Sequence, residues 1–231
     1  MTITILKPGL QTTIQSRPRT GLRHQGVPGG GAADPLSLAL ANRLVGNAWD
    51  APALEATLLG PTLRIDSSCA LAITGATCSA TLGGRALAGH ETVFAKPGDE
   101  LHLGSAEADA RIYIAFAGGI AVDDVLGSAS TNLQAGFGGH GGRALQAGDV
   151  LQLAGGRCDP LETPAEFRLP SSSSRALRTC VAAETELLDD VSLAALFDTN
   201  WVIDRRADRM GPVSYTHLRA HETLRSIAYA V

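Results

Sequence analysis

Short apolar runs separated by turn residues fill most of the chain. Residues 2–6, TITIL, alternate β-branched and apolar side chains and end at a Lys-Pro-Gly turn, and residues 11–15, QTTIQ, follow at once. Alternation of this kind predicts strands, and the short glycine-containing connection predicts that these two strands pair as a hairpin. From residue 53 onward, similar runs predict further short strands in LEATLLG, TLRID, LAITGAT, TVFA, DELHLG and RIYIAFAGG.

One segment between these strands carries the signals of a helix at both ends. Asp34 is suited to the N-cap and Pro35 to the first helical position, while leucines recur at every fourth residue from Leu36 to Leu44 and Gly46 follows. This pattern predicts a helix with both of its ends marked. A second segment, DDVSLAALFD at 189–198, also has a helix-like pattern.

Two turns nearly repeat each other. PGDELHLG at 97–104 and AGDVLQLAG at 147–155 share a Gly-Asp pair followed by alternating apolar residues. We expect the same turn-to-strand chemistry at both places.

Composition favours a mainly β fold. The 231 residues include 26 glycines and 11 prolines, and only 4% are aromatic and 18% charged, a balance that suits short strands and tight turns. A net charge of −4 provides no basic stripe, so we expect no nucleic-acid partner and no anionic lipid surface. Since no apolar run is long enough to span a bilayer, and the four cysteines are widely spaced with no CxxC pair, we expect a cytoplasmic protein with free thiols.

The polar run at 171–174, SSSS, preceded by Leu-Pro, marks the best domain boundary. The sequence therefore predicts a first β unit at 1–168, a linker at 169–175 and a second unit from 176. The second unit would begin with a strand in RTCVAA and continue through the helix-like segment.

The C-terminal stretch VSYTHLRAHET places His217 and His221 four residues apart, as in some zinc sites. No glutamate follows the first histidine and no third ligand is evident, so we expect no metal there. Read back into codons, these residues resemble a transposon-end adapter used for sequencing libraries. We therefore expect residues 212–231 to be non-native read-through and the second unit, 176–211, to be truncated.

No GxxxxGK[ST] loop, GxSxG elbow, HExxH pair or dinucleotide GxGxxG is present. Glycine and small hydroxyl residues are instead concentrated at 26–34, 117–131 and 135–149. Such loops can expose consecutive main-chain N–H groups that bind an anion or stabilise an oxyanion. They can equally supply bulges and tight corners of a barrel, and both interpretations stay open.

Individual side chains in these loops have a functional and a structural interpretation. Ser128, Ser130 and Thr131 can orient a substrate or bind local backbone. Arg143 can grip a carboxylate in a bidentate manner or form a surface ion pair. Asn42 can face a ligand or stabilise the helix end.

Two further titratable residues need an explanation. Glu55 lies in an apolar run, so it is either a buried anchor for a loop or an acid with a raised pKa. His140 can act as a general acid or base, but its glycine neighbours favour a solvent-facing side chain.

Taken in order, five blocks of the sequence resemble one family. The blocks are GVPGGGAADPLSLALANRLVGN, LEATLLGP, AFAGGIAVDDVLGSASTN, GGHGGRALQAGD and ADRMG. They are similar to the biotin-dependent carboxyltransferase family, which includes the C subunit of 5-oxoprolinase, the carboxyltransferase part of urea carboxylase and the Kip antagonist protein. The resemblance runs from about residue 6 to residue 211, with Ser16 where the family usually has an aspartate.

The resemblance implies a mainly β protein with cyclophilin-like β-barrel units and one or two short helices. It implies the C subunit of an ATP-dependent 5-oxoprolinase, a lactam hydrolase that opens 5-oxoproline to glutamate and uses ATP in the assembled complex. Its partners would be a sister carboxyltransferase-like subunit and a lactam-utilisation subunit. The alternatives are a carboxyltransferase module of urea carboxylase, with biotin as cofactor, and a non-catalytic regulator that antagonises a kinase inhibitor.

Both enzymatic alternatives develop negative charge on a carbonyl-type oxygen, and the resemblance suggests which residues would stabilise it. Ser130 and Arg143 would be catalytic, with Arg143 as the carboxylate or phosphate clamp. The expected substrate-binding residues are Gly118, Gly119, Ser128, Thr131, Gly138, Gly139 and Asn42.

Overall fold

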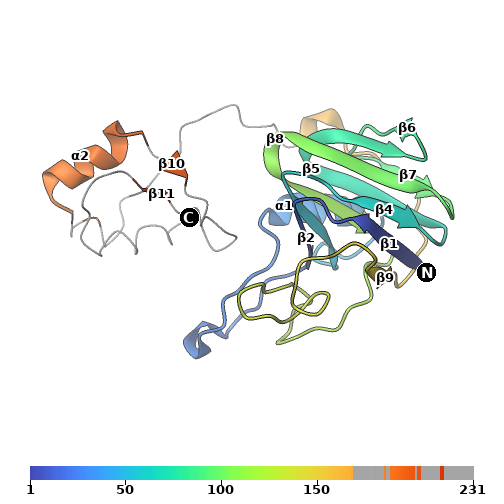
Figure 1. The fold of residues 1–231 in the computed structure, drawn as a ribbon, viewed down its shortest axis with the longest axis horizontal. Helices are drawn as coiled ribbons and strands as arrows, with labels where there is room; N and C mark the ends of the chain where they lie inside the picture. The colour runs from blue at the N-terminus through green and yellow to red at the C-terminus, as the bar shows by residue number, and fades with distance from the viewer. Residues whose placement is uncertain (169–179, 181–184, 186–187, 201, 204–213, 216–231) are drawn as a thin grey trace. The chain divides into compact units, whose positions relative to one another are not determined.

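The computed structural model describes residues 1–168, 180, 185, 188–200, 202–203 and 214–215. The chain divides into two compact units, residues 1–173 and residues 174–231. The first unit is a strongly curled antiparallel sheet that forms a half-barrel, with long loops below it in the view of Figure 1. The prediction of a mainly β fold is confirmed.

Nine strands form this sheet in the order β2-β3-β8-β4-β1-β9, and β5 pairs with β6, β7 and β8. Their bounds are β1 (Thr2–Lys7), β2 (Gln11–Gln15), β3 (Ala53–Thr57), β4 (Thr62–Ile65), β5 (Cys69–Leu82), β6 (Arg85–Ala86), β7 (Thr92–Ala95), β8 (Glu100–Phe116) and β9 (Val150–Gln152).

The long strands β5 and β8 give the sheet its curl. DELHLG and RIYIAFAGG, predicted as separate strands, belong to one strand of 17 residues, β8, which pairs with β4 near its start and with β3 near its end. The register of β5 against β8 shifts repeatedly between Gly75 and Ala80, and such bulges bend a strand. Gly75 has φ +86, and a Cβ there would lie 2.3 Å from the carbonyl oxygen of Arg111, so the bend requires glycine.

The predicted hairpin between the first two strands is wrong. β1 lies between β4 and β9, whereas β2 pairs with β3. Ile3 and Ile5 of β1 are fully buried in the core inside the curled sheet. Pairing with distant strands therefore buries the apolar face of β1, while the local turn sends the chain to a different neighbour.

The repeated turn is confirmed. In each copy the aspartate, Asp99 or Asp149, accepts a hydrogen bond of 2.8 Å from the main-chain N–H three residues before it. The preceding glycine has φ of 89° in one copy and 92° in the other. The N–H of this glycine donates to the carbonyl oxygen of Ile65 in the first copy and to that of Ile5 in the second. Each turn is therefore bonded to a neighbouring strand.

Helix α1 (Pro35–Leu44) has the predicted ends. Asp34 caps it by accepting from the N–H groups of the second and third helical residues at 3.1 and 3.0 Å. Leu36 is 52% exposed, whereas Leu38, Ala41 and Leu44 are buried against the outer face of the sheet. The spacing of four does not by itself define the buried face, because it drifts around a helix of 3.6 residues per turn.

The second unit contains helix α2 (Asp190–Asp198), which confirms the helix predicted at 189–198. A short strand β10 (Val202–Ile203) pairs with β11 (Ser214–Tyr215). The predicted linker at 169–175 lies outside the described residues, as does most of the predicted strand at 178–183. Two 3₁₀ helices, η1 (Arg23–Gln25) and η2 (Ala165–Phe167), lie in the first unit. No helix within the described ranges is both long and apolar enough to cross a bilayer.

Candidate functional site

The glycine-rich loops meet around a group of buried hydroxyls. Ser128 and Ser130 are fully buried, and Ser130 Oγ accepts a hydrogen bond of 2.9 Å from the main-chain N–H of Ser16. Ser128 Oγ donates to the carbonyl oxygen of Arg17 at 2.6 Å. Thr131 Oγ1 donates to a carbonyl oxygen of β2 at 2.9 Å. The structure thus brings the three predicted hydroxyl residues together, and each of them bonds to backbone more than a hundred residues away along the chain.

Beside these serines lies a buried arginine that the sequence analysis missed. Arg19 is only 4% exposed, and its guanidinium is 4.7 Å from the centre of the Phe137 ring. Nε donates to the carbonyl oxygen of Val125 at 3.0 Å, and Nη2 donates to those of Ser128 and Ser130 at 3.2 and 2.6 Å. Arg19 stands in a loop among other arginines, and no pattern in the sequence distinguishes it from its exposed neighbour Arg17.

Gly138 and Gly139 allow the second glycine-rich loop to approach this group. A Cβ on Gly138 would lie 2.2 Å from the carbonyl oxygen of Ser130 and 2.7 Å from Nη2 of Arg19. A Cβ on Gly139 would lie 2.0 Å from Oγ1 of Thr131. Both positions therefore require glycine for packing.

The main-chain N–H groups of Gly118, Gly119, Gly138 and Gly139 were expected to face a substrate. Three of these four groups donate to acceptors within the protein instead. The N–H of Gly118 donates to Asn47 Oδ1 at 2.8 Å, and that of Gly119 donates to the carbonyl oxygen of Phe116 at 2.8 Å. The N–H of Gly139 donates to the carbonyl oxygen of Ala129 at 2.9 Å. These bonds favour the structural interpretation of the glycine corners.

A groove of about 510 Å³ opens between the segments 121–125 and 136–142. Val125, Phe137 and Gly138 line it, and the same residues surround Arg19. Gly138 and Gly139 thus share a groove with the chain that follows Gly119. Gly118 and Gly119 themselves pack against Gly155 and Pro52.

Arg143, predicted as a substrate clamp, grips a carboxylate of its own chain. Nη1 and Nη2 donate to the two carboxylate oxygens of Asp149 at 2.7 and 2.8 Å. The hydrogen bonds from Arg143 lower the pKa of Asp149 from 3.8 to about 2. His140 Nε2 lies 3.5 Å from the same carboxylate. The guanidinium of Arg143 is therefore engaged inside the turn, which corresponds to its structural interpretation.

Asn42 and Glu55 both stabilise loops. Asn42 is fully buried, and its Nδ2 donates to the carbonyl oxygen of Ala51 at 2.9 Å. Glu55 is 1% exposed, and its Oε2 accepts from the hydroxyl of Tyr113 at 2.8 Å and from the N–H of Ala33 at 2.9 Å. The interpretation of Glu55 as a buried anchor agrees with these bonds.

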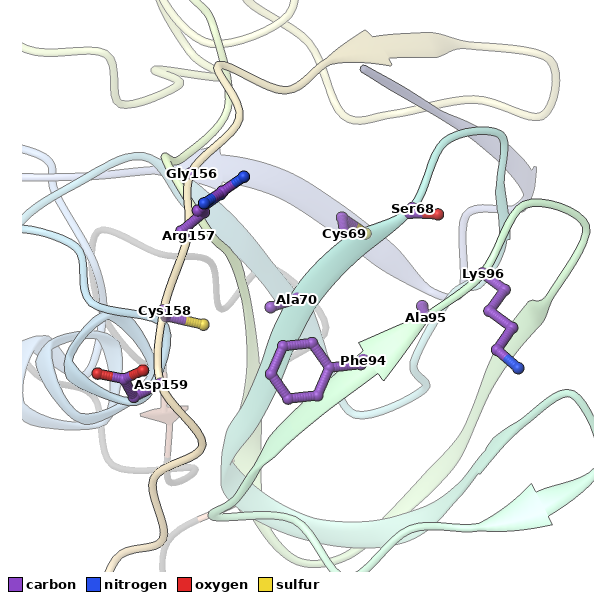
Figure 2. Close-up of a pocket in the computed structure, with 10 residues that line it drawn as sticks. All are labelled: Ser68, Cys69, Ala70, Phe94, Ala95, Lys96, Gly156, Arg157, Cys158 and Asp159. Carbon is purple, nitrogen blue, oxygen red and sulfur yellow. The ribbon is translucent and has the colours of Figure 1, made fainter.

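A second groove, of about 580 Å³, lies between β7 and the segment 156–159 (Figure 2). Cys69 and Cys158 line it, and Figure 2 shows Lys96 and Arg157 on opposite sides. Burial raises the pKa of the Cys69 thiol to about 11, and it also raises the pKa of Cys158. Both thiols are protonated at neutral pH, so this groove offers no thiolate nucleophile.

Within the described residues, no three side chains of His, Cys, Asp or Glu lie close enough together to hold a metal ion. His217 and His221 lie outside that part of the chain.

The curled sheet is that of a carboxyltransferase domain. Residues 25–225 match the family described as carboxyltransferase domain, subdomain A and B, and the chain belongs to this family. The matched range runs past residue 211, into the stretch that also resembles an adapter. The family predicted from the five sequence blocks is confirmed.

Two types of relative are similar to the chain. It is 36% identical over 207 residues to the C subunit of 5-oxoprolinase from Escherichia coli, a match that covers 90% of this chain and 66% of that protein. It is 34% identical over 220 residues to urea amidolyase of Saccharomyces cerevisiae, covering 90% of this chain and 12% of that protein. The chain therefore spans about two thirds of one relative and a small part of the other.

The structure is similar to that of urea carboxylase from Kluyveromyces lactis, with a TM-score of 0.84 and 33% identity. The likeness covers 93% of this chain and 20% of that protein.

Proposed function

We propose that the chain is the C subunit of an ATP-dependent 5-oxoprolinase, which opens the lactam of 5-oxoproline to glutamate. The observation that carries this proposal is the 36% identity to a 5-oxoprolinase subunit over 90% of the chain. A second protein of the same name, from Haemophilus influenzae, is 32% identical over 209 residues. In both comparisons the chain covers most of a separate subunit.

The groove beside Arg19 is the best candidate for the substrate site. Its volume of about 510 Å³ is in the range of small-molecule pockets. Opening a lactam develops negative charge on the carbonyl oxygen, which nearby donors and a positive charge stabilise. The glycines of the loop 136–142 line the groove with main chain, and Arg19 places a buried positive charge beside it that suits a negatively charged substrate.

We assign ATP to the assembled complex rather than to this groove, because the chain has no GxxxxGK[ST] loop. The proposed partners are a sister carboxyltransferase-like subunit and a lactam-utilisation subunit, and the complex would work in the cytoplasm. Activity would then require all the subunits together.

Reconstitution tests the proposal. The chain is purified with both partner subunits, and glutamate release from 5-oxoproline is measured with and without ATP. We expect ATP-dependent release that is lost when this chain is omitted. Release that does not require this chain would overturn the proposal.

Two matched glycine variants test whether the reaction takes place in the groove. Gly141 and Gly127 have φ of +65 and +80, and a Cβ on either would meet nothing within 4 Å. Gly141 lines the groove and Gly127 does not. We expect Gly141→Phe to fill the groove and abolish turnover, and Gly127→Phe to keep most of it. Equal activity of the two variants would remove the groove as the substrate site.

The alternative function is carboxyl transfer to urea, favoured by the TM-score of 0.84 to a urea carboxylase. It would require biotin as the carrier of the carboxyl group. In a system that supplies a biotin carboxylase, its biotinylated carrier, bicarbonate and ATP in place of the 5-oxoprolinase partners, urea would then stimulate ATP hydrolysis. A chain that binds its sister subunit but supports neither reaction would instead be a regulator.

A further inference from the structure

The positive charge of Arg19 is buried without a carboxylate partner. Its bonded partners are three main-chain carbonyl oxygens, and its Nη1 atom is buried with no hydrogen bond. Asp124 is the carboxylate that most favours its charge, but Asp124 is engaged by Arg17 at 2.7 Å. One donor group of the guanidinium, and much of its charge, is therefore uncompensated.

An arginine cannot remove this imbalance by losing a proton. Desolvation lowers the pKa of Arg19, but a guanidinium stays protonated in proteins. A buried charge without a counter-charge is strongly unfavourable unless a partner compensates it. The serine hydroxyls beside Arg19 are already bonded to backbone and carry no charge. Neither these hydroxyls nor the carbonyl oxygens supply a full counter-charge, which a bound anion would provide.

Glycines border both terminal nitrogens of the Arg19 guanidinium. A Cβ on Gly30 would lie 3.5 Å from Nη1, and a Cβ on Gly138 would lie 2.7 Å from Nη2. Phe137 covers one face of the guanidinium plane. The edge that carries Nη1 is thus bordered by the glycine segment 29–31, whose Gly29 carbonyl oxygen accepts from the main-chain N–H of Arg19 at 2.7 Å.

We propose that Arg19 binds the carboxylate of a small substrate through Nη1, with the glycine segment 29–31 moving aside to admit it from the adjoining groove. This inference rests on the proposed function, because 5-oxoproline carries a carboxylate beside its lactam ring. Arg19 would hold the carboxylate, and the lactam would remain in the groove. The positive charge then gains its counter-charge only when substrate is bound.

Calorimetric titration of the full chain tests this with 5-oxoproline, acetate and 2-pyrrolidinone, the lactam that lacks the carboxylate. We expect 5-oxoproline to bind about tenfold or more tightly than 2-pyrrolidinone, the factor typical of a charge-assisted hydrogen bond. Arg19→Gln should remove this difference and leave the affinity for 2-pyrrolidinone unchanged. Binding of acetate that also depends on Arg19 would identify the carboxylate as the recognised group.

The matched control is Arg17→Gln, since Arg17 is an exposed arginine two residues away that pairs with Asp124. We expect it to bind 5-oxoproline as the unchanged chain does. Equal affinity for 5-oxoproline and 2-pyrrolidinone in the unchanged chain would overturn the proposal, as would full affinity in Arg19→Gln.

A measurement on the unchanged chain covers the case in which Arg19→Gln does not fold. In nitrogen-15 NMR of the arginine side chains, 5-oxoproline and acetate should shift the Arg19 guanidinium signals, and 2-pyrrolidinone should not. An unchanged Arg19 signal at saturating 5-oxoproline would contradict the proposal. Carboxylate binding without glutamate release by the reconstituted complex would overturn the proposed function and leave the Arg19 site standing.

Discussion

Buried polar residues in this protein serve mainly to fasten loops to the sheet. Glu55 in β3 receives hydrogen bonds from Tyr113 in β8 and from Ala33 just before α1. Tyr113 also accepts from the N–H of Asp34 at 2.7 Å, so one carboxylate and one phenol hold the start of the helix against the sheet. Arg19 differs from these anchors because one of its donor groups is unused.

The pKa of Asp149 makes a testable statement about acid stability. Its pKa is lowered from 3.8 to about 2, so its bonds with Arg143 stabilise the folded chain fully above about pH 4. This contribution is lost as the pH falls toward about 2. We expect Asp149→Asn to lower the free energy of unfolding at neutral pH and to flatten its fall between these pH values.

Urea unfolding at a series of pH values measures this effect. Asp66→Asn provides a comparison at a carboxylate whose pKa is also lowered, chiefly by the hydroxyl of Thr4. An unfolding free energy of Asp149→Asn that follows the same pH curve as the unchanged chain would show that the Arg143 pair contributes nothing.

At the scale of elements, helix α1 shows how tertiary contacts choose a face. Its leucines occur on more than one side, and the sheet selects Leu38 and Leu44 for burial while Leu36 stays exposed. Its N-terminus needs no such selection, since Asp34 and Pro35 act through local geometry.

A pair of leucine variants tests the observed face of α1. Leu38 is 2% exposed and Leu36 is 52% exposed. We expect Leu38→Ala to lower the free energy of unfolding by about 2–5 kcal/mol, because it leaves a cavity, and Leu36→Ala to change it by less than about 0.5 kcal/mol. Chemical denaturation measures both. The reverse order would contradict the burial of Leu38 against the sheet.

At the scale of the whole first unit, the repeated turn is used at two distant places in the sheet. One copy joins β7 to β8 and bonds to the end of β4, and the other leads into β9 and bonds to β1. Both copies use an aspartate carboxylate and a glycine with φ near 90°. The same Gly-Asp turn therefore leads into a strand in the interior of the sheet and into a strand at its edge.

Matched glycine variants test whether the two turns are equivalent. A Cβ on Gly98 or Gly148 would meet nothing within 4 Å, so only backbone strain opposes a side chain. We expect Gly98→Ala and Gly148→Ala each to lower the melting temperature by a similar amount, at a cost of about 1 kcal/mol. Gly142→Ala should cost more, since its Cβ would lie 2.1 Å from main-chain atoms of Gly136. Equal effects in all three variants would refute this interpretation of the strain.

Sequence reasoning was most successful where structure depends on neighbouring residues. The strand segments, the cap at Asp34 and the repeated Gly-Asp turn could be inferred, because β-branched alternation, side-chain capping and glycine φ angles act over a few residues. The family followed from the resemblance of five sequence blocks. The hairpin of the first two strands failed because strand partners are selected by burial across the whole sheet.

The candidate site shows the same division. The sequence by itself determined which loops contain the glycines and hydroxyls, and the structure places Ser128, Ser130 and Gly138 together. Only the tertiary structure decided that Arg143 would pair with Asp149 and that Arg19 would be buried beside the groove. An arginine side chain is long enough to reach many partners. The buried position of Arg19 therefore depends on Ser128 and Ser130, more than a hundred residues away along the chain, which no local pattern records.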